Sequence, residues 1–168
     1  MLCVPMLCPS LPRCFSPISV SIFTYCFLAA ILEAGGDILK FAGDAFLAYW
    51  SCSRFAASGT LAYVLKESLM MQNDFDMFQT PDGVSLRMKL GLSIGKVELH
   101  YIGNEQYKTF DITGEAVDDV NKAQSLTKSG AVVISKTAWE MCNKQRCFAS
   151  LVGPGFAQVD VDHLITKI

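Results

Sequence analysis

Between residues 85 and 94, every second position is a large apolar residue: Leu86, Met88, Leu90, Leu92 and Ile94. The positions between them are polar, charged or glycine. A period of two is that of a β-strand, whose successive side chains face opposite sides of a sheet. The pattern therefore predicts a half-buried strand over 85–94, with one face on a core.

Shorter apolar runs separated by turn residues predict hairpins on either side of this strand. The runs 37–41 and 45–50 flank Ala42-Gly43-Asp44, which has the composition of a tight turn. Residues 97–101 form a returning strand after Gly95-Lys96. Further strand-like segments lie at 109–113, at 132–134 and on both sides of Gly153-Pro154-Gly155.

Apolar residues at helical spacing predict helices between these strands. The first covers about 58–72, the second follows Gly114, and the third is capped by Ser135 and runs to about Cys142. Because helices and antiparallel hairpins are interleaved, we expect an α+β fold in which one antiparallel sheet is covered by helices.

The first 32 residues are unusual in charge: they contain no Asp or Glu, and Arg13 is their only charged side chain. Residues 15–32 form an uncharged stretch at the lower length limit for spanning a bilayer. One interpretation is an irregular apolar leader over 1–20, followed by a domain over 21–168 that begins with a core helix from Ser21 to Glu33. The alternative is a signal peptide or membrane anchor, which the four prolines within residues 5–17 disfavour.

The overall charge makes one class of partner improbable. Of the 168 residues, 14 are Lys or Arg and 16 are Asp or Glu, which gives a net charge of −2. This balance argues against a protein held to nucleic acid by phosphate contacts. The seven cysteines include no Cys-x-x-Cys pair and fit a reducing compartment. We therefore expect a cytoplasmic protein, membrane-associated only if the leader is inserted.

Asp44 is the sharpest candidate for chemistry. It lies between small residues at the tip of the predicted hairpin, where its oxygens are available to a hard cation such as Mg²⁺. Lys40, four residues earlier, is placed to hold an anion or to screen the acid. The alternative is that Gly43-Asp44 is an ordinary turn pair.

A second group of polar residues surrounds Gly114. Asp111 ends a strand-like run, and Gly114 allows a tight turn into the following helix. Little more than one turn of this helix then carries three polar residues whose side chains point in neighbouring directions: Asp118, Asn121 and Lys122. The alternative is a solvated helix face, with acids favoured near the helix N-terminus by the dipole.

Three segments resemble the class III nucleotidyl cyclases, in the order and spacing of that family. Residues 35–45, GGDILKFAGDA, resemble its metal-binding hairpin; residues 90–95, LGLSIG, are similar to its next core strand; and residues 114–120, GEAVDDV, resemble a helix start. The likeness is greatest to the first catalytic domain of the soluble, bicarbonate-responsive adenylyl cyclases. It covers about residues 25–139.

The resemblance implies a ferredoxin-like cyclase homology domain. Two such domains would pair head to tail and bind ATP with two Mg²⁺ or Mn²⁺ ions at their interface. The implied reaction is in-line attack of the ribose 3′-oxygen on the α-phosphorus, giving cyclic AMP and pyrophosphate, with the metals activating the nucleophile and neutralising phosphate charge.

The resemblance also assigns roles to individual residues. Asp44 matches the second metal-binding Asp. Lys40 matches the lysine that contacts bicarbonate, and Ile112 matches a backbone position lining the same pocket.

Four residues occupy family columns with altered or uncertain chemistry. Asp111 stands where many adenylyl cyclases keep a base-reading Asp, and Asn121 stands where the soluble enzymes have an arginine that helps to hold bicarbonate. Asp118 and Lys122 stand where the wider family has an Asn and an Arg that stabilise the transition state.

The first metal-binding Asp has no counterpart before Glu33. We therefore expect the sheet to lack the first metal-binding strand, and the chain to retain one carboxylate ligand and to be inactive alone. The alternative is a non-catalytic regulatory or dimerisation module that binds a partner cyclase domain or a small anion.

Overall fold

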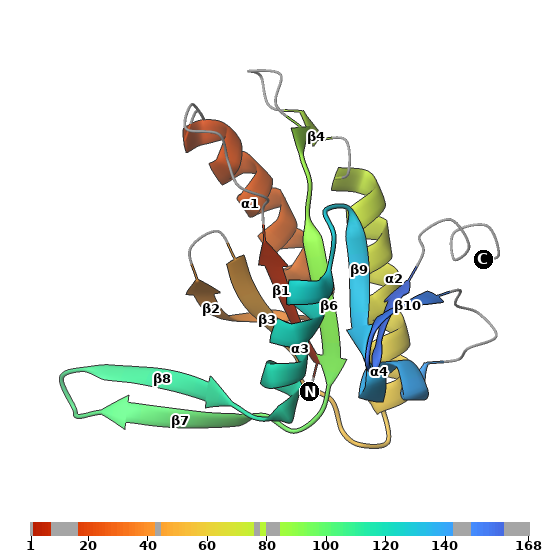
Figure 1. The fold of residues 1–168 in the computed structure, drawn as a ribbon. Coiled ribbons are helices and arrows are strands. Elements are labelled where there is room, and N and C mark those ends of the chain that lie inside the picture. The colour runs from red at the N-terminus through yellow and green to blue at the C-terminus, as the bar shows by residue number, and fades with distance from the viewer. Residues whose placement is uncertain are drawn as a thin grey trace.

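The structure is a computed structural model that describes residues 2–7, 17–42, 45–75, 78–79, 85–142 and 149–159 (Figure 1). The helices are α1 (Pro17–Glu33), α2 (Ala57–Phe75), α3 (Glu115–Leu126) and α4 (Lys136–Met141). The strands are β1 (Leu2–Leu7), β2 (Asp37–Ala42), β3 (Ala45–Trp50), β4 (Phe78–Gln79), β5 (Ser85–Leu86), β6 (Lys89–Ile94), β7 (Glu98–Gly103), β8 (Lys108–Thr113), β9 (Ala131–Ser135), β10 (Ala149–Gly153) and β11 (Phe156–Val159). The predicted helices, the hairpin of β2 with β3 and the strands on both sides of Gly153-Pro154-Gly155 are thus confirmed, with most bounds shifted by a few residues. The expected return of residues 97–101 along the strand at 85–94 is wrong, because β7 pairs with β8, whereas β6 pairs with β1 and β9.

The main sheet has seven strands in the order β10-β11-β9-β6-β1-β3-β2. The chain order β1-α1-β2-β3-α2-β6, with the sheet order β6-β1-β3-β2, is the ferredoxin-like arrangement that the resemblance implies. The predicted α+β class is therefore confirmed. The expectation of a purely antiparallel sheet is wrong at one pair, because β6 and β9 are parallel and α3 makes the crossover between them.

Strand β1 lies at the centre of this sheet, between β3 and β6 (Figure 1). The expectations of an irregular leader over 1–20 and of a missing first strand are therefore wrong for residues 2–7. Prolines suggested irregular structure because they cannot donate a ladder hydrogen bond. The strand tolerates Pro5 because its register with β6 pairs residues 2, 3, 6 and 7 and skips positions 4 and 5.

Helix α1 begins at Pro17, earlier than the expected cap at Ser21, and ends at Glu33 as predicted. Proline suits the first turn of a helix because the amide N–H there needs no partner within the helix. Phe27 and Ile31 are fully buried in the core. Within the described ranges, α1 included, no helix has the length and apolar content needed to cross a membrane.

The turn after α1 is fixed against β3. The indole Nε1 of Trp50 donates a hydrogen bond to the carbonyl oxygen of Ala34 at 2.9 Å. Gly36 lies so close to the indole ring that a Cβ there would be 2.6 Å from two of its carbon atoms. This contact sets the start of β2, and hence the position of the hairpin that carries Lys40.

Strand β6 is buried on both faces. Leu90, Leu92 and Ile94 belong to the main core, as the alternation predicts. Gly91 and Ser93, on the other face, are also buried, because α3 packs directly over them. The prediction of a half-buried strand is therefore wrong. The predicted strand over 85–94 is also divided, since β5 ends at Leu86 and β6 begins at Lys89.

Strands β7 and β8 form a separate two-stranded hairpin that extends away from the main sheet (Figure 1). Every residue of β7 is exposed, and Ile112 is the one buried residue of β8. The hairpin joins α3 through Gly114, whose φ of 132° lies in the region that favours glycine. A Cβ at Gly114 would be 2.6 Å from the carbonyl oxygen of Lys96. The tight turn predicted at Gly114 is thus confirmed.

Candidate functional site

A cavity of about 280 Å³ lies between the β2–β3 hairpin and α3. Its lining comes from β2, β3, β8 and α3: Lys40, Ala42, Ala45, Phe46, Leu47, Ile112, Val117 and Asn121. Three residues that the sequence singles out, Lys40, Ile112 and Asn121, are therefore brought together in one place. They come from three separate elements of the chain.

Packing on both sides of the cavity holds these residues. Ile112 is 7% exposed and packs in a small apolar cluster with Leu47 and Val120. Helix α3 approaches the sheet closely over Gly91, where a Cβ would be 2.9 Å from the backbone nitrogen of Gln124. The close approach of α3 places its residue Asn121 at the cavity.

Lys40 supplies the positive charge of the cavity and already has a partner. Its Nζ lies 3.6 Å from Oδ1 of Asp111 on β8, and both side chains are more than half exposed. Asn121 is neutral, and the other lining residues are apolar. The cation and the neighbouring carboxylate therefore balance each other.

The other predicted site residues that the structure describes are not part of this lining. Asp118 and Lys122 are exposed on α3 and do not line the cavity. The predicted cluster on this helix is therefore divided: Asn121 faces the cavity and its two neighbours do not. Asp44 lies outside the described residues, but Ala42 and Ala45, which flank the Gly43-Asp44 turn, both line the cavity.

The residues that could hold a metal ion are few. Within the part of the chain that the structure describes, no group of three or more His, Cys, Asp or Glu residues is placed to hold a metal. Strand β1 has the sequence Leu-Cys-Val-Pro-Met-Leu and contributes no carboxylate beside β3. Asp44 is therefore the one predicted metal ligand, and its carboxylate is of the kind that Mg²⁺ prefers.

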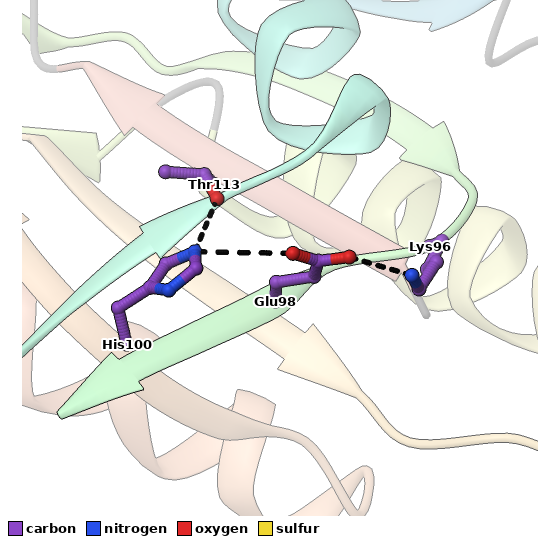
Figure 2. A network of polar contacts seen from close by, with 4 residues as sticks. All are labelled: Lys96, Glu98, His100 and Thr113. Atoms are coloured by element: carbon purple, nitrogen blue, oxygen red, sulfur yellow. Dashed lines mark hydrogen bonds and ion pairs between the residues drawn. The ribbon is translucent and has the colours of Figure 1, made fainter.

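A polar network runs along the base of the β7–β8 hairpin (Figure 2). Lys96 Nζ lies 2.5 Å from Glu98 Oε1, and His100 Nε2 lies 2.8 Å from Thr113 Oγ1 and 3.9 Å from Glu98 Oε2. The hydrogen bond and charge of Lys96 lower the pKa of Glu98, and those of Glu98 raise the pKa of Lys96. None of these four residues lines the cavity beside Lys40.

A larger cavity, of about 540 Å³, lies at the ends of β3 and β6. It is bordered by Arg54, Ile94, Lys96 and Met141, among others, and its described lining contains none of the site residues predicted from the sequence. Size alone does not identify a site. The smaller cavity is the better candidate because three predicted residues converge on it.

Two features of the site were not predicted from the sequence. One is the contribution of Phe46, Leu47 and Val117 to the cavity lining, and the other is the ion pair between Lys40 and Asp111. The three apolar residues follow ordinary core patterns, so nothing in the sequence separates them from other buried residues. The ion pair joins β2 to a hairpin far along the chain, and depends on how that hairpin is placed. No local sequence signal indicates such a contact.

Comparison with known proteins decides the family. Residues 25–156 match the family described as the adenylate and guanylate cyclase catalytic domain. The chain belongs to this family. It is 36% identical over 129 residues to adenylate cyclase type 10 of Rattus norvegicus and, equally, to that of Homo sapiens. Each match covers 74% of this chain and 8% of the length of the relative.

Solved cyclase structures have the same fold at low sequence identity. The guanylate cyclase domain of RhGC from Catenaria anguillulae, in complex with GTP, has a TM-score of 0.75 at 16% identity, with 95% of this chain and 94% of that chain covered. A guanylyl cyclase domain of the RhoGC fusion protein from Blastocladiella emersonii, described as a non-canonical dimer, has a TM-score of 0.75 at 15% identity, with 94% of this chain and 92% of that chain covered. The adenylyl cyclase CyaB from P. aeruginosa has a TM-score of 0.74 at 14% identity, with 95% of this chain and 92% of that chain covered.

Proposed function

We propose that this chain is an adenylyl cyclase-type domain that acts in cyclic nucleotide signalling. Its reaction is the conversion of ATP to cyclic AMP and pyrophosphate. The observation that carries the proposal is the convergence of Lys40, Ile112 and Asn121 on one cavity beside the Gly43-Asp44 turn, in a cyclase fold. The 36% identity to adenylate cyclase type 10 favours ATP over GTP.

Asp44 is the proposed ligand for Mg²⁺ or Mn²⁺. A bound divalent ion would activate the attacking ribose oxygen and neutralise phosphate charge. The family pattern uses two aspartates for this purpose, and β1 offers no second one. A site with one carboxylate stabilises the developing charge poorly, and we therefore propose that the chain does not cyclise ATP alone.

A second cyclase homology domain, in the same or another chain, is the proposed partner. Its support is the dimeric cyclase domain from Blastocladiella emersonii, which has the same fold. Asp118 and Lys122 are exposed on α3, and Asp111 is exposed on β8, so all three are accessible to such a partner. The domain would act in the cytoplasm, without contact to nucleic acid or insertion into a membrane.

Lys40 and Ile112 are the proposed contacts for a small anion of the bicarbonate type. The ammonium group supplies charge, and the buried Ile112 forms an apolar wall. The cavity, at about 280 Å³, is large enough to admit an anion of this size.

The second candidate function is a non-catalytic regulatory or dimerisation module. The absence of a carboxylate from β1 favours it, because a module of this kind needs the fold and the partner surface but not the metal pair. The two functions differ in whether the chain turns over ATP when its partner is bound.

The test is to measure cyclic AMP formation by this chain with Mg²⁺ and with Mn²⁺, alone and mixed with a second-type domain of a soluble adenylyl cyclase. Heterodimer formation is followed in parallel by analytical ultracentrifugation. We expect slow product formation in the mixture, because only one of the two metal carboxylates is offered, and none from the chain alone. A stable heterodimer that yields no product would instead establish the regulatory module.

A further inference from the structure

Lys40, which lines the cavity between the β2–β3 hairpin and α3, has an acidic side chain as its neighbour. Asp111 Oδ1 lies 3.6 Å from Lys40 Nζ, at ion-pair distance. Asp111 comes from β8, whose next residue, Ile112, is anchored in the apolar cluster with Leu47 and Val120. The packing of Ile112 restrains the backbone of the neighbouring Asp111, from which the carboxylate reaches the ammonium group.

The other groups around the cavity do not restore a positive charge. Among the lining residues that the structure describes, Asn121 contributes a neutral amide and Lys40 is the one cation. A free anion that enters the cavity therefore meets an ammonium group that is already paired.

An attached carboxylate has a further advantage over a free anion. Because both groups belong to one folded chain, Asp111 acts at a high effective concentration and loses little additional entropy on pairing. A free anion must displace the Asp111 carboxylate from the Lys40 ammonium group before it can pair with it. Two like charges about 4 Å apart already change a binding constant by about fivefold in water-like surroundings, and by more where water is partly excluded.

We propose that Asp111 is the resident counter-ion of Lys40 and competes with free anions of the bicarbonate type for the cavity. The domain then binds such anions more weakly than it would with an unpaired lysine. This inference rests on the anion site of the proposed function, and makes Asp111 the residue that determines its ligand specificity.

The test uses the full chain and bicarbonate as the probe, at constant pH and ionic strength, with chloride in the reference solution. Binding is followed by NMR shifts of the Ile112 methyl and Asn121 amide groups. Asp111→Asn should bind bicarbonate at least about fivefold more tightly than the original chain. The double variant Asp111→Asn/Lys40→Met should lose this gain. Glu105→Gln is the matched control, since it removes one carboxylate from the exposed loop between β7 and β8.

Three outcomes would overturn the inference: equal affinity in the original chain and in Asp111→Asn, an equal gain in Glu105→Gln, or no binding in any variant. The last result would also remove the anion site, whereas the cyclase assay with the partner domain tests the catalytic proposal separately. Circular dichroism and the dispersion of the NMR spectrum show whether each variant is folded.

Discussion

Gly91 on β6 lies directly beneath Gln124 on α3, so closely that a Cβ at position 91 would be 2.9 Å from the backbone nitrogen of residue 124. It would also be 3.0 Å from the carbonyl oxygen of Val120. The obstacle is helix backbone, which cannot move aside as a flexible side chain can. The distance between α3 and the sheet, and with it the width of the cavity, therefore depends on the absence of a side chain at this position.

Gly91→Val should push α3 away from β6. We expect a loss of about 1–3 kcal/mol in the free energy of unfolding, typical of overpacking a buried site, and altered NMR shifts at Asn121. Gly59→Ala is the control, because nothing lies within 4 Å of a Cβ there and alanine is the better helix former. Urea denaturation measures both. Equal stability of Gly91→Val and the original chain would contradict the packing described for α3.

Gln72 on α2 should be replaceable with a gain in stability. Its side chain is 1% exposed, and neither its nitrogen nor its oxygen has a hydrogen-bond partner among the described residues. An unsatisfied buried amide costs about 1–3 kcal/mol. Gln72→Met, of similar volume, should therefore raise the free energy of unfolding by about 1 kcal/mol or more.

Ser68→Ala is the matched control for this substitution. Ser68 is equally buried on the same helix, but its hydroxyl donates to the carbonyl oxygen of Val64 at 2.7 Å. Its replacement should give no comparable gain. A Gln72→Met protein that unfolds at lower urea concentration would show that the amide is satisfied in solution.

Glu98 should titrate below the ordinary range of a glutamate. Its pKa is lowered mainly by the hydrogen bond and charge of Lys96, with a smaller contribution from His100. Because the pKa is lower in the folded chain, the contribution to stability is present at neutral pH and is lost as the pH falls through that pKa.

Lys96→Ala should raise the pKa of Glu98 towards its ordinary value, as measured by NMR of the side-chain carboxyl carbon. Lys128→Ala removes an exposed lysine from the segment after α3 and should leave that titration unchanged. An unaltered pKa in Lys96→Ala would contradict the contact shown in Figure 2.

A carboxylate placed at the end of β1 should raise cyclase activity. In the register of β1, Pro5 pairs with Leu47, which packs in the apolar cluster with Ile112 and Val120. Met6 pairs with Phe46, which belongs to the main core. Alternate positions of a strand share a face, so position 7 is on the face of position 5.

The variant Leu7→Asp is assayed with the partner domain and Mn²⁺. Its rate of cyclic AMP formation should be about tenfold higher or more, because a second metal ligand lowers the activation barrier by several kcal/mol in favourable cases. Met6→Asp adds the same charge on the other face and should give no increase. Equal rates in Leu7→Asp and the original chain would show that the missing carboxylate does not limit catalysis.

Local patterns in the sequence predicted the elements that local chemistry determines. Gly114 was expected to allow a tight turn, and its φ of 132° and its contact with Lys96 explain why. Ser135 was expected to cap a helix, and its hydroxyl accepts a hydrogen bond from the amide of Ala138 at 3.3 Å.

Contacts between distant segments could not be predicted in the same way. The strand at 2–7 was missed because Pro5 argues against it locally, whereas the neighbouring strands β3 and β6 supply its hydrogen bonds. The burial of Gly91 depends on where α3 lies. The pairing of Lys40 with Asp111 depends on the placement of the β7–β8 hairpin.

The proposed function requires that this cyclase-family domain supports catalysis through Asp44 once a second cyclase domain is bound. Cyclic AMP formation by the mixed domains with Mn²⁺ is measured for the original chain, for Asp44→Ala and for Asp74→Ala, which removes an exposed acid on α2 and serves as the control. We expect product from the original chain and from Asp74→Ala, and none from Asp44→Ala. Product that persists in Asp44→Ala, or its absence from all three despite heterodimer formation, would contradict it.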